Sequence, residues 1–113
     1  MVTLYSEVED QVWKALADGK RRRILDELSQ GPRSTGDLVK LFPTIGRTGV
    51  MKHIQVLENA SLIEIRREGC VRWNYLNPEQ IEKTCSPWIK RHIDGLTTSI
   101  AHLKALAEPT NKH

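Results

Sequence analysis

Three polar residues, Thr48, Lys52 and Gln55, recur at intervals of four and three within the stretch 44–60. In a helix, which turns by about 100° per residue, they lie on one face and an apolar stripe lies on the other. The stripe consists of Val50, Ile54 and Leu57. A hydroxyl, an ammonium and an amide can between them donate to and accept from the base edges in the major groove of B-DNA. The spacing therefore favours base recognition by this helix, which we call the reading helix.

Two strand-like runs, 62–66 and 71–76, follow the reading helix and are joined by a short turn. Their alternation of apolar and polar residues predicts an antiparallel hairpin with one packed face and one wet face. We expect Ile63, Ile65, Val71, Trp73 and Tyr75 to pack, and Glu64, Arg66, Arg72 and Asn74 to face water. Gly69 gives the turn its backbone freedom. Arg67 and Arg72 beside it can reach phosphates next to the groove, so the hairpin is predicted to be a basic wing.

The elements before the reading helix come in the order that a helix-turn-helix requires. Helical patterns are predicted over about 7–17 and 20–29. Ser34 offers an N-cap for a short helix, which Pro43 ends. A short helix, a tight turn, a longer amphipathic helix and a hairpin predict a winged helix-turn-helix, mainly α with a small β-hairpin. A helix with a polar face more often contacts only water, and it is this order of elements that favours DNA.

The C-terminal part of the chain is predicted to be helical over about 78–107. Asn77-Pro78 and Ser86-Pro87 each look like an N-cap followed by proline at the first helical position, so this part is either two helices or one interrupted helix. Apolar residues then alternate in steps of four and three, as in a coiled coil. This seam consists of Ile89, Ile93, Leu96, Ile100, Leu103 and Ala107.

Such a seam needs a partner, and the most economical one is a second copy of the chain. We expect a homodimer whose interface includes Val8 and Val12 of the first helix and Ile89, Ile93, Leu96, Ile100 and Leu103 of the seam. A twofold dimer would present two reading helices about 34 Å apart to an inverted-repeat operator in double-stranded DNA. The alternative is that the last helix folds back on its own domain.

The length of 113 residues predicts a single domain, with core and wing at about 7–76 and dimerisation helices at about 78–107. No apolar run approaches the roughly 18 residues that span a bilayer, and no signal peptide is recognisable, so we expect a cytoplasmic protein that does not bind a membrane. The net charge is only +3. Positive charge is concentrated in the run 20–23 and around the wing, where it can meet phosphates or simply face solvent.

Catalysis is not expected. No nucleophile stands near a base, no carboxylates are paired, and no glycine-rich phosphate loop is present. The two cysteines, Cys70 and Cys85, have no CxxC spacing and are expected to be reduced thiols. The chain is therefore predicted to be neither an enzyme nor a disulfide-bonded protein.

The stretch ALADGKRRRILDEL resembles the opening of the ArsR-type (ArsR/SmtB) winged-helix repressors. The resemblance continues through STGDLVKLF, GVMKHIQVLENASLI and RREGCVRWNYLNPEQI to about Trp88. GVMKH together with RREG and YLNP is similar to a branch of that family that lacks the metal-binding cysteines. The resemblance implies a dimeric DNA-binding repressor that controls its own gene or a neighbouring one.

Carried over by position, the resemblance implies that Arg47, Thr48, Lys52 and His53 lie where the reading helix meets DNA. We expect His53, on the flank of the buried stripe, to orient the helix or touch a phosphate and not to read a base. Met51 stands where many relatives have serine, and it could contact a thymine methyl. The complete predicted DNA-binding set is Arg47, Thr48, Met51, Lys52, His53, Gln55, Arg67, Arg72, Lys20, Arg21 and Arg22.

Metal sensing, which the resemblance raises, is not expected. The family's thiolate site needs paired cysteines in the helix before the reading helix, and STGDLVKLF has none. Its other site lies on the last helix, where this chain offers His92, Asp94 and His102 with Ala105 in place of the last ligand. Because structural zinc takes four ligands, we predict no metal and no cofactor. Redox sensing through either cysteine is not expected, since no vicinal thiol is present.

Two other functions stay open at this point. A winged-helix module could use the same surfaces to bind another protein and no DNA, although the basic hairpin argues against it. A small-molecule effector could bind in the dimer interface near Trp88, which is more often a core residue at such a place. The effector reading is compatible with DNA binding.

Overall fold

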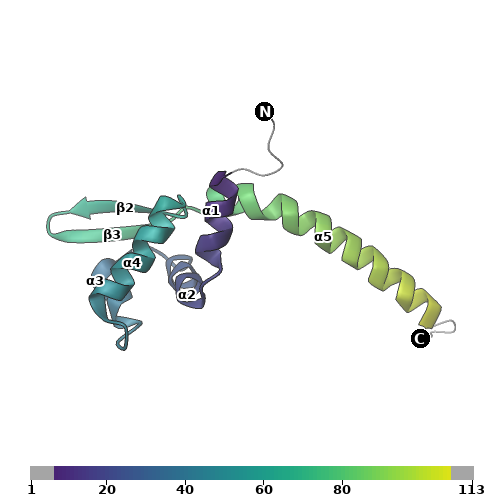
Figure 1. Cartoon of the computed structure of the whole chain (residues 1–113), viewed down its shortest axis with the longest axis horizontal. Coiled ribbons are helices and arrows are strands. Elements are labelled where there is room, and N and C mark those ends of the chain that lie inside the picture. The colour runs from purple at the N-terminus through teal and green to yellow at the C-terminus, as the bar shows by residue number, and fades with distance from the viewer. Residues whose placement is uncertain (1–6, 108–113) are drawn as a thin grey trace. The chain divides into compact units, whose positions relative to one another are not determined.

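The computed structural model describes the backbone of residues 7–107 and the side chains of residues 7–93. In chain order the elements are α1 (Glu7–Leu16), α2 (Gly19–Leu28), β1 (Arg33–Ser34), α3 (Thr35–Lys40), α4 (Gly46–Asn59), β2 (Ile63–Glu68), β3 (Val71–Leu76) and α5 (Pro78–Ala107) (Figure 1). The chain divides into two compact units, one up to residue 81 and one from residue 82. The first unit contains α1 to α4 and the sheet. The reading helix is therefore α4, and the wing is the hairpin of β2 and β3.

The core of the first unit is built from the apolar stripes of its four helices. Its fully buried side chains include Val12, Ala15, Ile24, Leu38, Val50, Ile54, Leu57 and Leu62. The predicted stripe of α4 is confirmed, since Val50, Ile54 and Leu57 are at most 1% exposed. Burying each such side chain contributes roughly 1.5–3 kcal/mol. The polar side of α4 is consequently held outward by the packing of its apolar side.

The burial of Val12 corrects one prediction. Val12 was expected in a dimer interface, but it is 0% exposed inside the first unit and has no surface left for a second copy. Val8 is 56% exposed on the same helix. Since Val8 and Val12 are one turn apart, α1 carries its core contact on Val12 while Val8 lies at the surface.

Side-chain caps fix where α2 and α3 begin. The carboxylate of Asp18 accepts hydrogen bonds from the backbone N–H of Lys20 at 2.7 Å and of Arg21 at 3.4 Å. The hydroxyl of Ser34 accepts one from the backbone N–H of Asp37 at 3.1 Å, which is the predicted cap. Each cap satisfies N–H groups that a helix cannot satisfy internally.

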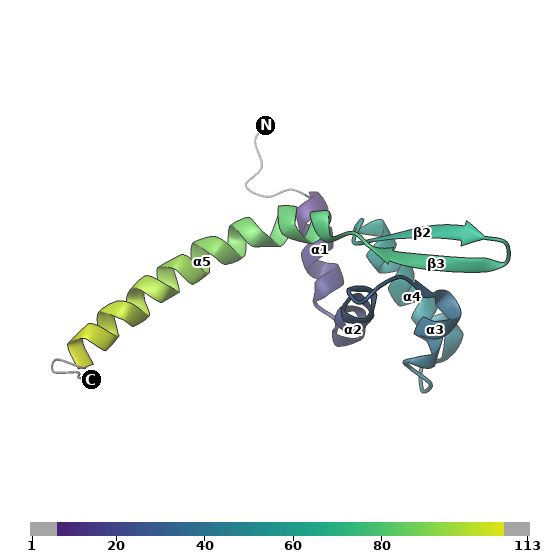
Figure 2. The same cartoon turned by 180° about the vertical axis from the view of Figure 1, so that it is seen from behind.

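The sheet has three antiparallel strands in the order β1-β3-β2. The short strand β1, which the sequence did not predict, pairs Arg33 with Asn74 and Ser34 with Trp73. It joins the start of α3 to the wing. In both views the turn of the hairpin lies at the side of this unit away from α1 (Figures 1 and 2). Gly69 has a φ of +64° in that turn, as the sequence predicted.

The packed face of β3 differs from the predicted one. Residues paired across antiparallel strands share a face, and the register pairs Ile63 with Leu76 and Ile65 with Asn74. Asn74 is therefore on the packed face and is 0% exposed, whereas Trp73 lies with Arg66 on the other face. The prediction that Asn74 faces water and that Val71, Trp73 and Tyr75 pack against the core was wrong, because alternation alone does not say which face of the strand meets the core.

The amide nitrogen of Asn74 is accommodated in the interior by hydrogen bonds, while its Oδ1 is buried without a partner in the described part of the chain. Its Nδ2 donates to the carbonyl of Arg33 at 3.2 Å and to Oγ1 of Thr35 at 3.1 Å. The Thr35 hydroxyl donates in turn to the carbonyl of Arg72 at 3.5 Å. A protein interior tolerates buried polar groups when they are hydrogen-bonded. This chain of bonds ties the wing to the start of α3.

The C-terminal part is a single helix, α5, which continues through Pro87. Proline has no N–H, so the helix lacks the hydrogen bond to the carbonyl of Lys83. The predicted seam begins on exposed side chains, since Ile89 is 39% and Ile93 is 52% exposed. Leu96, Ile100, Leu103 and Ala107 lie outside the residues whose side chains are described.

Candidate nucleic-acid interface

The outward face of α4 carries the predicted reading residues. Arg47, Thr48, Lys52 and Gln55 are exposed, and Met51 is half-buried between them. All four exposed residues come from one helix whose opposite side is locked in the core, so their spacing is fixed by helix geometry. A face of this kind is available to a large partner such as a duplex.

Gln55 is held by its own helix. Its Nε2 donates to Oδ1 of Asn59 at 2.9 Å and to Oε1 of Glu58 at 3.4 Å. These i,i+4 and i,i+3 bonds are exposed and of the kind that contribute only a few tenths of a kcal/mol each. Gln55 can therefore exchange them for bonds to a base at low cost.

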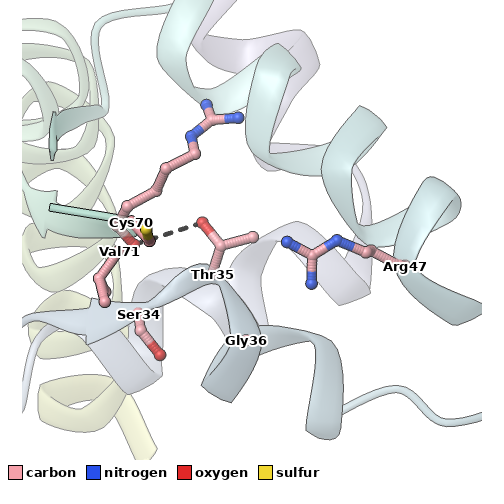
Figure 3. A pocket seen from close by; sticks show the side chains of 7 residues that line it. Ser34, Thr35, Gly36, Arg47, Cys70 and Val71 are labelled. Carbon is pink, nitrogen blue, oxygen red and sulfur yellow. Dashed lines mark hydrogen bonds between the residues drawn. The ribbon is translucent and has the colours of Figure 1, made fainter.

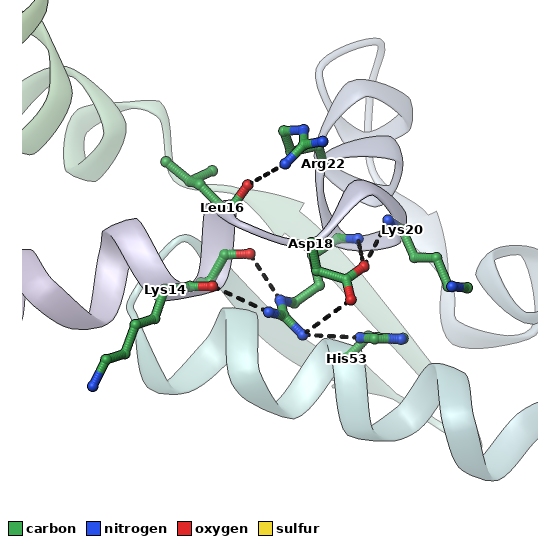
Figure 4. A network of polar contacts seen from close by, with 8 residues as sticks. Lys14, Leu16, Asp18, Lys20, Arg22 and His53 are labelled. Atoms are coloured by element: carbon green, nitrogen blue, oxygen red, sulfur yellow. Dashed lines mark hydrogen bonds and ion pairs between the residues drawn. The ribbon is translucent and has the colours of Figure 1, made fainter.

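Arg21 does not belong to the exposed charge of the run 20–23. Its Nε donates to the carbonyl of Ala15 at 2.8 Å, and Nη2 donates to the carbonyl of Lys14 at 3.1 Å (Figure 4). Its side chain is only 16% exposed and lies 3.9 Å from the carboxylate of Asp18. The guanidinium thus caps the C-terminal end of α1. The expectation that Arg21 contacts phosphate is corrected, because its donors are used inside the protein.

His53 is the partner of Arg21 on the reading helix. Its Nδ1 lies 3.2 Å from Nη1 of Arg21. Arginine has no acceptor, so Nδ1 is the acceptor in this contact. His53 is half-buried at this contact. Its position supports the expectation that it orients α4, and it joins α4 to the corner between α1 and α2.

Asp18 completes this polar corner (Figure 4). Partial burial would raise the pKa of its carboxyl, but the backbone N–H groups of Lys20 and Arg21, together with nearby positive charge, outweigh burial. The pKa therefore lies below its ordinary value of 3.8. The carboxylate is kept ionised by the same bonds that start α2.

Lys20 and Arg22 remain at the surface. Nη1 of Arg22 donates to the carbonyl of Leu16 at 2.6 Å but the side chain stays exposed. Lys20 is exposed as well. Of the three residues predicted from the run 20–23, these two have the accessibility that a phosphate contact needs.

The wing carries one contact that the sequence analysis missed. The guanidinium of Arg66 lies over the ring of Tyr75, 4.7 Å from its centroid, and pairs with Glu64 at 3.2 Å. The hydrogen bond to Glu64 and its charge raise the pKa of Arg66. Arg66 thereby covers an aromatic ring on the outer face of the hairpin. The exposed cation nearest the turn is Arg67.

A small cavity lies where the wing meets α3 and α4. It has a volume of about 240 Å³ and is lined by Ser34, Thr35, Gly36, Arg47, Cys70, Val71 and Arg72 (Figure 3). The guanidinium of Arg47 points toward Thr35. Arg72 is half-buried, and its Nε is buried without a hydrogen-bond partner in the described part of the chain. Sequence reasoning could not find this cavity, because its walls come from three segments that only the folded unit brings together.

In the part of the chain with described side chains, no three metal-ligating residues are grouped. His92 stacks on Trp88 with ring centroids 4.2 Å apart, and its Nδ1 lies 3.0 Å from the carbonyl of Trp88. Asp94 and His102 lie outside the described side chains. Trp88 itself is 46% exposed. Across the described residues, no helix combines the length and the apolar character needed to span a bilayer.

Comparison with known proteins identifies the class of this chain. Residues 16–66 match the family described as Helix-turn-helix domain. The chain is 41% identical over 69 residues to the HTH-type transcriptional regulator Rv2034 of Mycobacterium tuberculosis, covering 61% of this chain and 64% of Rv2034. It is 35% identical over 88 residues to YuzN of Bacillus subtilis, described as an uncharacterized HTH-type transcriptional regulator, covering 73% of this chain and 96% of YuzN.

Solved structures agree with these relatives. The crystal structure of an ArsR family transcriptional regulator, RHA00566, superimposes with a TM-score of 0.73 at 29% identity, covering 85% of this chain and 97% of that one. The chain therefore belongs to the ArsR-type winged helix-turn-helix transcriptional regulators, a family of DNA-binding proteins. The predicted winged helix-turn-helix fold, mainly α with a small β-hairpin, is confirmed, and β1 extends the hairpin to three strands.

Proposed function

We propose that this chain binds an inverted-repeat operator in double-stranded DNA as a homodimer and represses transcription by covering promoter DNA. The observation that carries the proposal is the face of α4, where Arg47, Thr48, Lys52 and Gln55 are exposed while the opposite side is fully packed. A dimer on an inverted repeat places two such helices in successive major grooves. The proposed role needs binding alone, without catalysis, metal or cofactor.

Base contacts and phosphate contacts are assigned to different elements. Arg47, Thr48, Lys52 and Gln55 read base edges, and the methyl group of Met51 can contact a thymine. Lys20, Arg22 and Arg67 contact phosphates, which gives affinity without sequence preference. Arg21 and His53 hold α4 in place from behind.

Dimerisation is assigned to the seam of α5. Ile89 and Ile93 are exposed at its start, and the apolar spacing continues through Leu96, Ile100 and Leu103 in the sequence. A stripe with coiled-coil spacing is stabilised by knobs-into-holes packing against a second helix. A small-molecule effector bound in the dimer interface would act through this seam.

The test begins with selection of bound fragments from the source genome, followed by a mobility-shift titration on the selected sequence. If a dimer neutralises about 6–10 phosphates, affinity falls by about 10³–10⁵ between roughly 50 and 200 mM salt. Light scattering should give twice the monomer mass, and transcription in vitro from a promoter containing the site should fall.

Three outcomes would contradict the proposal. Recovery of no enriched sequence, together with weak binding that is independent of salt, would favour a winged-helix module that binds another protein. A monomeric mass at the concentrations used for DNA binding would contradict the proposed dimer. Increased transcription from the bound promoter would reverse the sign of regulation.

A further inference from the structure

The cavity between the wing, α3 and α4 has the lining of an anion site. Two guanidinium groups, Arg47 and Arg72, contribute to it, and none of its lining residues is acidic. A small anion placed there would meet positive charge from two sides. Planar guanidinium donors suit phosphate oxygens well.

A hydrogen-bond donor in the cavity wall is also left over. The Ser34 hydroxyl accepts from the N–H of Asp37, so its own O–H is still available to donate.

The size of the cavity selects the class of ligand. Its volume of about 240 Å³ is below the roughly 300–1,000 Å³ of pockets that hold drug-sized molecules. Liquid water occupies about 30 Å³ per molecule, so the cavity has room for a tetrahedral oxyanion with a few waters. Both the arginine lining and the volume of the cavity fit a phosphate group.

The walls are held together before any ligand arrives. Asn74, which is 0% exposed, joins Arg33 and Thr35, and Thr35 donates to the carbonyl of Arg72. This buried polar chain fixes the wing residue Arg72 against the start of α3. A preformed site loses less freedom on binding than one that must assemble.

We propose that this cavity is an oxyanion site that binds a phosphate group between Arg47 and Arg72. The phosphate can come from the DNA backbone, in which case the site deepens the proposed function: Arg47 then contacts the backbone in place of a base edge, and the wing and α4 are fixed on one strand. It can also come from a free phosphate ion, which would then compete with DNA. Both sources present the same tetrahedral oxyanion to the same donors.

The first test needs no DNA, so it stands even if the proposed function fails. Inorganic phosphate is titrated into the full chain at constant ionic strength while backbone amide resonances are recorded. We expect saturable shifts at residues 34–36 and 70–72 and little change elsewhere. Shifts that are absent, or that spread evenly over all exposed basic segments, would overturn the site.

Matched variants locate the site. Arg47→Gln and Arg72→Gln should each weaken phosphate binding at least tenfold, whereas Lys40→Gln removes the same charge from an exposed position outside the cavity and should not. Arg47 is exposed, so its variant keeps the test valid if Arg72→Gln fails to fold. Equal affinity in Arg47→Gln and Lys40→Gln would overturn the proposal.

A second arm distinguishes the two sources. The phosphate titration is repeated on the protein saturated with a duplex. Loss of the shifts at 34–36 and 70–72 would show that a backbone phosphate occupies the cavity, and persistence of the shifts would show that the site serves a free ion. Either result supports the oxyanion site, which only the first two tests can overturn.

Discussion

The guanidinium of Arg21 at the start of α2 lies 3.2 Å from Nδ1 of His53 on the reading helix. The same guanidinium donates to the carbonyls of Lys14 and Ala15 at the end of α1. One side chain thus joins three helices, and the helix proposed to enter DNA is anchored through His53 to the rest of the first unit. The charge of Arg21 therefore has a structural role, although Arg21 stands in a run of basic residues.

Replacing Arg21 by alanine should lower the free energy of unfolding by about 1–3 kcal/mol, because the carbonyls of Lys14 and Ala15 at the end of α1 lose their donor and His53 loses its partner. Urea denaturation measures this change. The matched control is Lys20→Ala, which should stay within about 0.5 kcal/mol of wild type since Lys20 is exposed. If Arg21→Ala proved as stable as Lys20→Ala and lost only DNA affinity, Arg21 would be a phosphate ligand after all.

The cap formed by Asp18 should give stability that depends on pH. Asp18→Ala should cost about 0.5–2 kcal/mol at neutral pH, as at other N-caps. Asp18→Asn keeps a capping oxygen but removes the charge. Because the folded pKa lies below 3.8, the charge stabilises the fold above that pH, and its contribution is lost as pH falls through the folded pKa.

The difference in unfolding free energy between wild type and Asp18→Asn should therefore be full at pH 7 and shrink at pH 3. Urea titrations of both proteins at the two pH values provide the measurement. A difference that stays constant across this range would mean that the ionised carboxylate contributes nothing beyond the cap.

Lys52→Ala should reduce operator affinity by about 1–3 kcal/mol and relax the preference at one base-pair position, if Lys52 reads a base. Gln55→Ala is the useful comparison, since Gln55 lies on the same face and can exchange its bond to Asn59 for a bond to a base at low cost. Competition binding with operators changed at single positions measures both effects. An equal loss on all sequences would mark Lys52 as a phosphate contact.

The two thiols should differ in reactivity. Burial raises the pKa of the Cys85 thiol, so at neutral pH it stays protonated and inaccessible, whereas Cys70 is exposed in the wing turn. Maleimide at pH 7 should modify Cys70 first, as followed by mass spectrometry. In the Cys70→Ser protein labelling should become slow, and fast labelling of Cys85 there would contradict its burial.

Element order and the packed side of α4 could be predicted from the sequence because the spacing of Val50, Ile54 and Leu57 is a local property of one helix. The role of Arg21 could not, since a charge in a sequence does not reveal which carbonyls it reaches. The buried side of β3 depended on strand register, which placed Asn74 inside in place of Trp73. The oxyanion cavity could not be predicted either, because it depends on helix packing, on side-chain contacts and on strand register together.

Asn74 limits how the strand pairing of the wing can vary during evolution. A slip of β3 by one residue would take its amide away from Arg33 and Thr35 and would bring a ring inward, so the hairpin has a single stable alignment. Because that alignment is fixed at the base of the hairpin, its turn can vary in length or charge while the apolar side of α4 keeps its place in the core. Natural variation in the turn can thus change the proposed phosphate contacts of the wing without unpacking the helix that is proposed to select the sequence.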